Sequence, residues 1–182
     1  PSTRTEPAAT SAAAVDRLML KSRLRKAFEK NELRVHYQPK IDLRDGSIAG
    51  AEALVRWELT DRGLVLPSEF IPLAEESNLI LELGEWVLDR VCRDYRSLRD
   101  SDINPGRISV NLSLRQLKQR DFISRVSAIC NQHGVSPGSL ELEITETTLM
   151  EDPVRTTRIL TELHEMGLRL AIDDFGTGYS SL

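Results

Sequence analysis

The chain has 182 residues, of which 40% are hydrophobic and 29% are charged, and its formal net charge is −4. This length fits one domain with room for a tail, and the composition is ordinary for a globular protein. The acidic balance argues against a general DNA- or RNA-binding protein, which would carry a basic excess. A small anionic ligand held through metal ions stays compatible with it.

Three further features of the sequence concern the cellular location of the protein and whether this chain is part of a longer one. Cys92 and Cys130 lack the spacing of a metal site, which predicts a reduced, cytoplasmic chain. No apolar run approaches about 18 residues, so we expect no membrane-spanning segment. The chain begins with Pro1 and no signal-peptide pattern follows, so we expect a piece of a longer protein, which itself could be membrane-anchored.

The first thirty residues divide into two segments. Residues 1–14, "PSTRTEPAATSAAA", are small and polar and include proline, which predicts a linker. Residues 15–30, "VDRLMLKSRLRKAFEK", predict an amphipathic helix with a basic, solvated face. A helix lying on a membrane surface is the alternative, which its acidic residues and modest apolar face disfavour.

From residue 33 onwards, expected strands and helices alternate. Strands are expected over 33–43 and 47–57, antiparallel or nearly so to each other. The elements expected after them are helix 66–77, helix 83–99, strand 107–113, a helix from Asp121 to Gly134, strand 139–146, a helix from Asp152 to Gly167, and strand 168–174. The short loops between them favour parallel strands with right-handed crossovers, which fits both a (β/α) barrel and an open doubly wound sheet.

Oxygen-bearing side chains interrupt four of the expected strands, at or near their carboxyl ends. Strands of a parallel sheet are usually buried on both faces and seldom carry charge. The exceptions are Glu52, Asn111, Glu143 with Glu146, and the pair Asp173 and Asp174. Successive members are 32 and 30 residues apart (143 − 111 and 173 − 143), about one βα unit each. This spacing predicts one polar ligand per strand at a common rim, where barrels build their active sites.

The chemistry of these side chains indicates a metal site. Carboxylate and amide oxygens are the donors that Mg²⁺ and Mn²⁺ prefer, and a cation would relieve the repulsion between converging carboxylates. Asp173 and Asp174 can share one site only where the strand ends and turns, which "FGTG" allows. Two metal ions there would activate a water and clamp a phosphoryl group. Any one of these residues could instead be a helix cap or a salt-bridge partner.

The segment "AEALVRW" contains the triplet Glu52-Ala53-Leu54, and the chain resembles the EAL domain family of bacterial cyclic-di-GMP phosphodiesterases from about Leu24 to Leu182. The resemblance also rests on "HYQPKIDL", "FIPLAEESNLI", "VNLS", "LELEITE" and "IDDFGTGYSSL", in the family's order and spacing. It implies a modified TIM (β/α)8 barrel with an antiparallel strand near the start, the second strand running antiparallel to the others. It also implies hydrolysis of cyclic di-GMP to linear pGpG with two Mg²⁺ or Mn²⁺ ions.

Matched residue by residue, the resemblance implies three groups of site residues. The metal ligands would be Glu52, Asn111, Glu143, Asp173 and Asp174. The residues assigned to catalysis are Glu52, Asp174, which would position the water, and Glu146, which resembles the anchor of the loop "DFGTGYSSL". That loop supports the second metal site and, in relatives, a dimer contact at 175–182. The substrate contacts would be Gln38, Leu54 and Arg56, whose planar guanidinium suits a phosphate or a guanine edge.

The resemblance also implies parts that the printed sequence does not contain. The family continues for roughly a further third, with a lysine that orients or activates the water, a glutamate ligand and a late glutamine. We therefore expect residues 1–182 alone, a truncated barrel with an open sheet edge, to be poorly stable and inactive.

Three functions remain as alternatives. The intact ligands favour a phosphodiesterase over a module that binds cyclic di-GMP without cleaving it, and over an interaction scaffold that binds no nucleotide. Segment 15–30 resembles the helix that joins an EAL domain to an upstream sensor or GGDEF domain.

Overall fold

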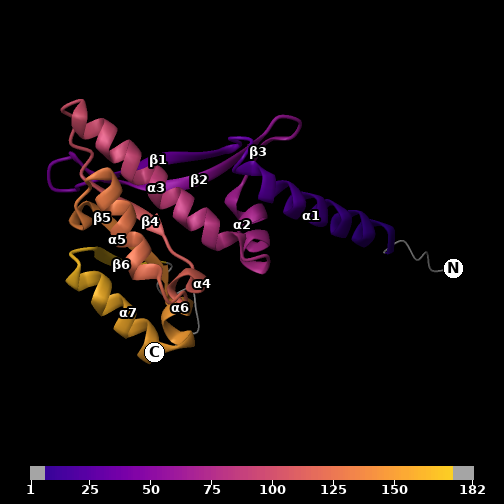
Figure 1. The fold of residues 1–182 in the computed structure, drawn as a ribbon. Coiled ribbons are helices and arrows are strands. Elements are labelled where there is room, and N and C mark those ends of the chain that lie inside the picture. Colours follow the sequence, from indigo (N-terminus) through magenta and orange to yellow (C-terminus); the bar gives the residue numbers. More distant parts are fainter. Residues whose placement is uncertain (1–6, 174–182) are drawn as a thin grey trace. The chain divides into compact units, whose positions relative to one another are not determined.

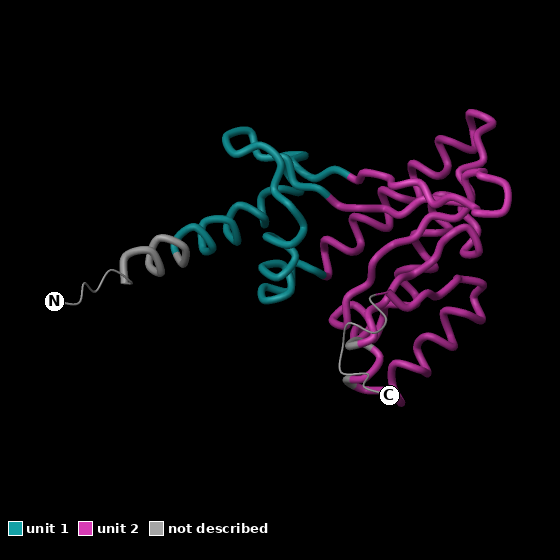
Figure 2. Tube along the Cα trace, turned by 180° about the vertical axis from the view of Figure 1, so that it is seen from behind, with its two compact units in different colours: residues 1–34, 56–80 teal, residues 35–55, 81–182 magenta. Residues whose placement is uncertain are grey.

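The computed structural model describes residues 7–173, with side chains described over 15–173 except at 147, 148 and 151. The chain divides into two compact units (Figure 2). Unit 1 comprises residues 1–34 and 56–80, and unit 2 comprises residues 35–55 and 81–182. Within the described residues, no helix combines the length and the hydrophobicity that crossing a membrane requires.

Unit 1 is built from helices and a short hairpin. Its elements are α1 (Pro7–Ala27), the end of β2 (Ile48–Leu59), β3 (Gly63–Val65) and α2 (Pro67–Glu76). The end of β2 pairs antiparallel with β3, so that Trp57 lies opposite Val65. Trp57 is fully buried and meets Phe70 edge to face, with ring centroids 5.8 Å apart. These rings and leucines from α1 form the core of this unit.

Helix α1 begins at Pro7, ahead of the predicted start at Val15. Whether residues 1–14 are a linker stays a prediction. The physical reason for the earlier start is composition. The stretch "PAATSAAA" is rich in alanine, the best helix former, and Pro7 takes the first position, where its missing N–H costs nothing. The sequence interpretation gave the small, polar character of this stretch more weight than its helix propensity.

Unit 2 contains a mostly parallel sheet (Figure 1). Its strands lie in the order β1 (Leu33–Ile41), β2, β4 (Arg107–Asn111), β5 (Leu140–Thr145) and β6 (Arg169–Asp173). The helical elements of the chain around them are α3 (Leu79–Asp100), α4 (Leu114–Leu117), α5 (Phe122–His133), η1 (Pro137–Ser139), α6 (Glu146–Glu151) and α7 (Pro153–Glu165). The strand–helix alternation predicted from sequence is confirmed.

The orientation of the first two strands differs in part from the prediction. β2 pairs parallel with β4, and β4, β5 and β6 are parallel to one another, so the second strand is not the antiparallel one. β1 and β2 are neighbours joined by a tight turn, in which Asp42 N donates to Ser47 O over 2.8 Å. So short a connection can join only antiparallel neighbours. The antiparallel strand near the start of the fold is therefore β1.

The parallel strands carry different residues on their two faces. One face is apolar and buried, with Ala53, Ile108, Val110, Leu140, Leu142 and Ile144. The other face is polar and contains Glu52, Ser109, Asn111, Glu141, Glu143 and Asp173, as the strand registers require. Helix α7 packs against β6 and α5 (Figure 1). A parallel sheet with one polar face is unusual, because such sheets are normally covered on both sides by apolar layers.

Two of the helix ends predicted from capping residues in unit 2 have the expected cap. Asp152 caps α7 by accepting from Arg155 N over 3.2 Å, and Gly134 ends α5 with φ +63°, both as predicted. Asp121 stands at the predicted cap of α5, but it caps no backbone N–H among the described residues. Its carboxylate accepts instead from Arg125 Nε over 2.6 Å. The guanidinium has displaced the capping bond.

Close backbone contact between β2 and β4 depends on glycine. A Cβ on Gly50 would lie 2.1 Å from the carbonyl oxygen of Arg107, which is too short for any side chain. We therefore expect Gly50→Ala to destabilise the protein by about 1–3 kcal/mol in urea unfolding, because β2 and β4 must separate to make room. The matched control is Gly138→Ala, where the nearest atom would be 3.6 Å away. The control should stay within about 0.5 kcal/mol of wild type, and an equal loss in both variants would contradict the prediction.

Candidate functional site

Strand register brings the four predicted ligands that the structure describes onto one face of the sheet in unit 2. Asn111 of β4 lies opposite Glu143 of β5, and Glu52 of β2 lies opposite Ser109 of β4. Asp173, the last residue of β6, lies opposite Thr145. The 30- to 32-residue spacing in the sequence thus corresponds to neighbouring strands, as predicted. Residues opposite each other in the ladder project to the same side of the sheet.

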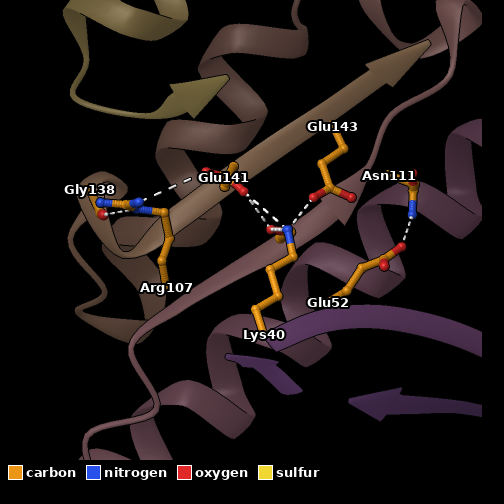
Figure 3. Close-up of polar contacts among 8 residues, drawn as sticks. Lys40, Glu52, Arg107, Asn111, Gly138, Glu141 and Glu143 are labelled. Atoms are coloured by element: carbon orange, nitrogen blue, oxygen red, sulfur yellow. Dashed lines mark hydrogen bonds and ion pairs between the residues drawn. The ribbon is translucent and has the colours of Figure 1, made fainter. Parts of the chain in front are cut away.

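Glu52 and Asn111 are in direct contact. Asn111 Nδ2 donates a hydrogen bond to Glu52 Oε1 over 2.8 Å, from one strand to its parallel neighbour (Figure 3). The bond limits the rotation of both side chains and holds the glutamate of the EAL triplet beside the carboxyl end of β4. Two of the five predicted ligands are therefore positioned with respect to each other by the protein alone.

Glu143 is the most buried of the predicted ligands that the structure describes, with 7% of its surface exposed. Its Oε1 accepts a hydrogen bond from Lys40 Nζ of β1. Burying a carboxylate is costly unless it is paired with a cation or hydrogen-bonded. Lys40 supplies that cation.

Lys40 is a site residue that the sequence interpretation missed. Its ammonium also donates to Ser109 Oγ over 2.6 Å and contacts Glu141 Oε1 at 3.2 Å (Figure 3). Ser109 Oγ in turn donates to Glu141 Oε1 over 2.7 Å. The signal was present in the sequence, since Lys40 is a charged residue inside an expected strand. It was overlooked because only oxygen donors were considered as candidate ligands.

Lys40, Glu141 and Glu143 stabilise one another's charged forms. Burial lowers the pKa of Lys40, but the hydrogen bonds to Glu143 and Glu141 outweigh it, and the pKa stands above its ordinary value. Burial likewise raises the pKa of Glu141, but hydrogen bonds from Ser109 and Lys40 outweigh it and hold the pKa below its usual range. Lys40 is therefore a permanent cation at neutral pH, and Glu141 is a permanent anion. Arg107 adds a second cation, 3.8 Å from the other oxygen of Glu141.

The remaining predicted residues are spread along the chain. Gln38 is exposed on β1, and Leu54 and Arg56 are half-buried on β2, two and four residues after Glu52. Glu146 is half-buried and begins α6 directly after β5, although a strand was predicted to extend to it. Asp174 and the loop 175–182 lie outside the described residues. The anchoring role of Glu146 and the role of Asp174 therefore stay predictions.

The donor set fits a hard divalent cation in its chemistry. The candidate ligands on the described strands offer only carboxylate and amide oxygens, which suit Mg²⁺ and Mn²⁺. Within residues 7–173, no three His, Cys, Asp or Glu side chains come close enough together to hold a metal ion. Nitrogen donors instead engage the carboxylates of Glu52 and Glu143. The described residues thus form a polar face on which Lys40 links Glu141 and Glu143 while Asn111 holds Glu52, and the shared metal site stays a prediction.

The chain matches a known protein family and is similar in sequence to several named proteins. The EAL domain matches residues 21–182. The bifunctional diguanylate cyclase/cyclic di-GMP phosphodiesterase MucR of Pseudomonas aeruginosa is 44% identical over 172 residues, which are 94% of this chain and 25% of MucR. The cyclic di-GMP phosphodiesterase PdeR of Escherichia coli is 41% identical over 165 residues, which are 91% of this chain and 25% of PdeR. The chain spans about a quarter of the length of these relatives.

Two solved structures have folds similar to that of this chain. The PaMucR phosphodiesterase, solved as a c-di-GMP complex, superposes with a TM-score of 0.85 at 44% identity, over 90% of this chain and 66% of that one. The EAL enzyme Bd1971, in its form with cAMP and cyclic di-GMP bound, also gives a TM-score of 0.85, at 31% identity, over 93% of this chain and 47% of that one.

Proposed function

Because this chain belongs to the EAL domain family, we propose that it hydrolyses one phosphodiester bond of cyclic di-GMP and releases linear pGpG. The observation that carries the proposal is the contact between Glu52 of the EAL triplet and Asn111, on the same polar sheet face as the buried Glu143. The names of the relatives support the substrate, since MucR and PdeR are both called cyclic di-GMP phosphodiesterases. The protein would lower the concentration of this second messenger in bacterial signalling, for example in the control of biofilms.

Two Mg²⁺ or Mn²⁺ ions are the proposed cofactors. The residues that would hold them are Glu52, Asn111, Glu143, Asp173 and Asp174. When bound, such ions lower the pKa of a coordinated water and neutralise charge on the phosphoryl group. The contribution of the chain itself is positional. Asn111 orients Glu52 through the 2.8 Å hydrogen bond, and Lys40 holds the carboxylate of Glu143.

Substrate binding is assigned to residues of the first two strands. We propose that Gln38, Leu54 and Arg56 contact the dinucleotide, and that Glu146 anchors the loop after Asp174 and so supports catalysis. Leu54 and Arg56 follow Glu52 at intervals of two along β2, so all three project to the same face of that strand. A guanidinium there can make two parallel hydrogen bonds to a phosphate or a guanine edge.

Replacement of Arg56 by lysine tests this assignment. Arg56→Lys keeps the positive charge but loses the planar pair of donors, so we expect KM for cyclic di-GMP to rise about tenfold while kcat changes less. Steady-state kinetics of product formation measures both constants. The control is Arg44→Lys, at an exposed arginine paired with Asp42 in the turn after β1. An unchanged KM in the Arg56 variant would remove Arg56 from the substrate site.

The central experiment is an assay for turnover. The full-length protein is incubated with cyclic di-GMP and Mn²⁺, and linear pGpG is quantified by chromatography. Accumulation of linear product that depends on Mn²⁺ supports the proposed hydrolysis. Binding of cyclic di-GMP without turnover would instead establish the alternative, a catalytically inactive receptor domain.

Several properties of the longer protein are also proposals. We propose an upstream sensor or GGDEF domain, in line with the bifunctional name of MucR, and a cytoplasmic location for this part of the protein. A homodimer contact through 175–182 and the inactivity of residues 1–182 expressed alone are proposed from the family resemblance. A polypeptide of residues 1–182 that turns over cyclic di-GMP like the full-length protein would refute the last of these.

A further inference from the structure

Lys40, on β1, bonds residues of two other strands of unit 2, β4 and β5. Its side chain extends from β1 over the polar face of the sheet and reaches Ser109 of β4 and Glu141 and Glu143 of β5 (Figure 3). About 38% of the side chain is exposed, against 8% of the Glu143 side chain. The lysine therefore covers a buried carboxylate from the more open side of the sheet face.

The ion pairs around Glu143 identify Lys40 as its counter-charge. Among the described residues, the ion pair of Glu143 is the one with Lys40, whereas Arg107 lies on the Glu141 side and bonds Gly138 O over 3.4 Å. Glu52 interacts with a neutral amide, which adds no positive charge. Without Lys40, the polar face would hold several carboxylates with little compensating charge at Glu143, which is costly for a buried group.

The same contact engages the carboxylate that a metal ion would bind. Glu143 is a proposed metal ligand, and its Oε1 is occupied by the ammonium group. A divalent cation that approaches Glu143 must displace that ammonium or share the carboxylate with it. In either case the two positive charges repel each other, and the repulsion is substantial at short range inside a protein.

We propose that Lys40 is the internal counterion of the metal site, which holds Glu143 in place when no divalent cation is bound and competes with the cation for it. The inference rests on the proposed metal-dependent function. It adds a positioning residue that sets metal affinity from the first strand of the sheet. Lys40 is thus assigned a role in metal affinity, and no contact with the reacting atoms is attributed to it.

The proposal has a signature that a purely structural lysine would not produce. Replacing Lys40 with a neutral residue should destabilise the metal-free protein, because Glu143 loses its cation. The same change should strengthen metal binding, by about tenfold or more, because a competing positive charge is gone. If Lys40 only supported the fold, its replacement would lower both the stability of the metal-free protein and its affinity for the metal, since a disordered Glu143 binds metal poorly.

The test measures metal binding separately from activity. Mn²⁺ is titrated into the metal-free full-length protein, free Mn²⁺ is followed by electron paramagnetic resonance, and melting temperatures are recorded with and without Mn²⁺. The variants are Lys40→Met, Lys40→Gln and the charge-conserving Lys40→Arg. Lys26→Met removes an exposed lysine of α1 in unit 1 and serves as the matched control.

The expected result is a lower melting temperature without Mn²⁺ and a Kd for Mn²⁺ at least about tenfold lower in Lys40→Met and Lys40→Gln. Lys40→Arg and Lys26→Met should keep the wild-type Kd within about threefold. If Lys40→Met does not fold, Lys40→Gln decides, because glutamine can still bond Ser109 and a carboxylate. An unchanged or higher Kd in the neutral variants overturns the counterion role. Failure of the wild-type protein to bind Mn²⁺ would instead overturn the proposed metal-dependent function.

Discussion

Glu52→Gln is expected to reduce kcat/KM for cyclic di-GMP by at least about a thousandfold at a Mn²⁺ concentration that saturates the wild-type protein. Glutamine has the shape of glutamate, and its carbonyl oxygen can still accept the hydrogen bond that Asn111 Nδ2 now donates over 2.8 Å. The change therefore removes the charge while preserving the local geometry. A neutral amide is a weak ligand for a hard divalent cation beside a carboxylate, so metal binding and turnover should fail together.

The Glu52 experiment needs a control on the same strand. Glu58→Gln removes a carboxylate from β2 that is exposed and pairs with Arg34 at 3.2 Å. That variant should keep wild-type kinetics, because an exposed ion pair contributes little. Melting temperatures of both variants should lie close to wild type. If Glu52→Gln retained more than about a tenth of wild-type activity, the role of Glu52 as an essential metal ligand would be wrong.

Trp57→Ala is expected to cost about 3–5 kcal/mol of unfolding free energy, the largest stability effect predicted for this chain. Trp57 is fully buried in unit 1 and packs edge to face on Phe70, with an angle of 76° between the rings. Its Nε1 donates to Glu32 Oε2 over 3.2 Å. Truncation leaves a cavity in the core and removes the donor from Glu32, and both changes destabilise the folded state.

Urea unfolding followed by circular dichroism measures this loss. Trp57→Phe keeps an aromatic ring and loses the N–H, so it should cost clearly less than the alanine variant. Leu64→Ala, at a half-exposed position on β3, should stay within about 0.5 kcal/mol of wild type. A cost below about 1 kcal/mol for Trp57→Ala would mean that unit 1 does not depend on this core for its stability.

The candidate site shows how far strand spacing can be interpreted from sequence. The prediction that Asn111, Glu143 and Asp173 lie on adjacent strands is confirmed by the β4, β5 and β6 pairings. It succeeded because right-handed crossovers place successive parallel strands side by side, so one βα unit of sequence is one step across the sheet. Glu52 was predicted from its place as a charged residue in the second strand, and the parallel pairing of β2 with β4 confirms that it lies on a strand next to that of Asn111.

Lys40 could not be assigned in the same way. It lies on β1, which precedes β2 by a tight hairpin and so has no βα spacing to any other site residue. Its partners are 69, 101 and 103 residues away in the sequence. Such contacts depend on how the sheet curves and how far a long side chain reaches, and neither property appears in a periodic pattern.

The sequence by itself determined the alternation of strands and helices, the strands on which the polar residues stand, and the family to which the chain belongs. These properties follow from local periodicity, from end signals such as Gly134 and Asp152, and from motifs that are contiguous in the chain. Tertiary structure alone decided that β1 is the antiparallel strand, that Asn111 bonds Glu52, and that Lys40 holds Glu143. The reason is that pairing direction and side-chain partnership are set by long-range packing, in which residues distant in the chain compete for the same neighbour.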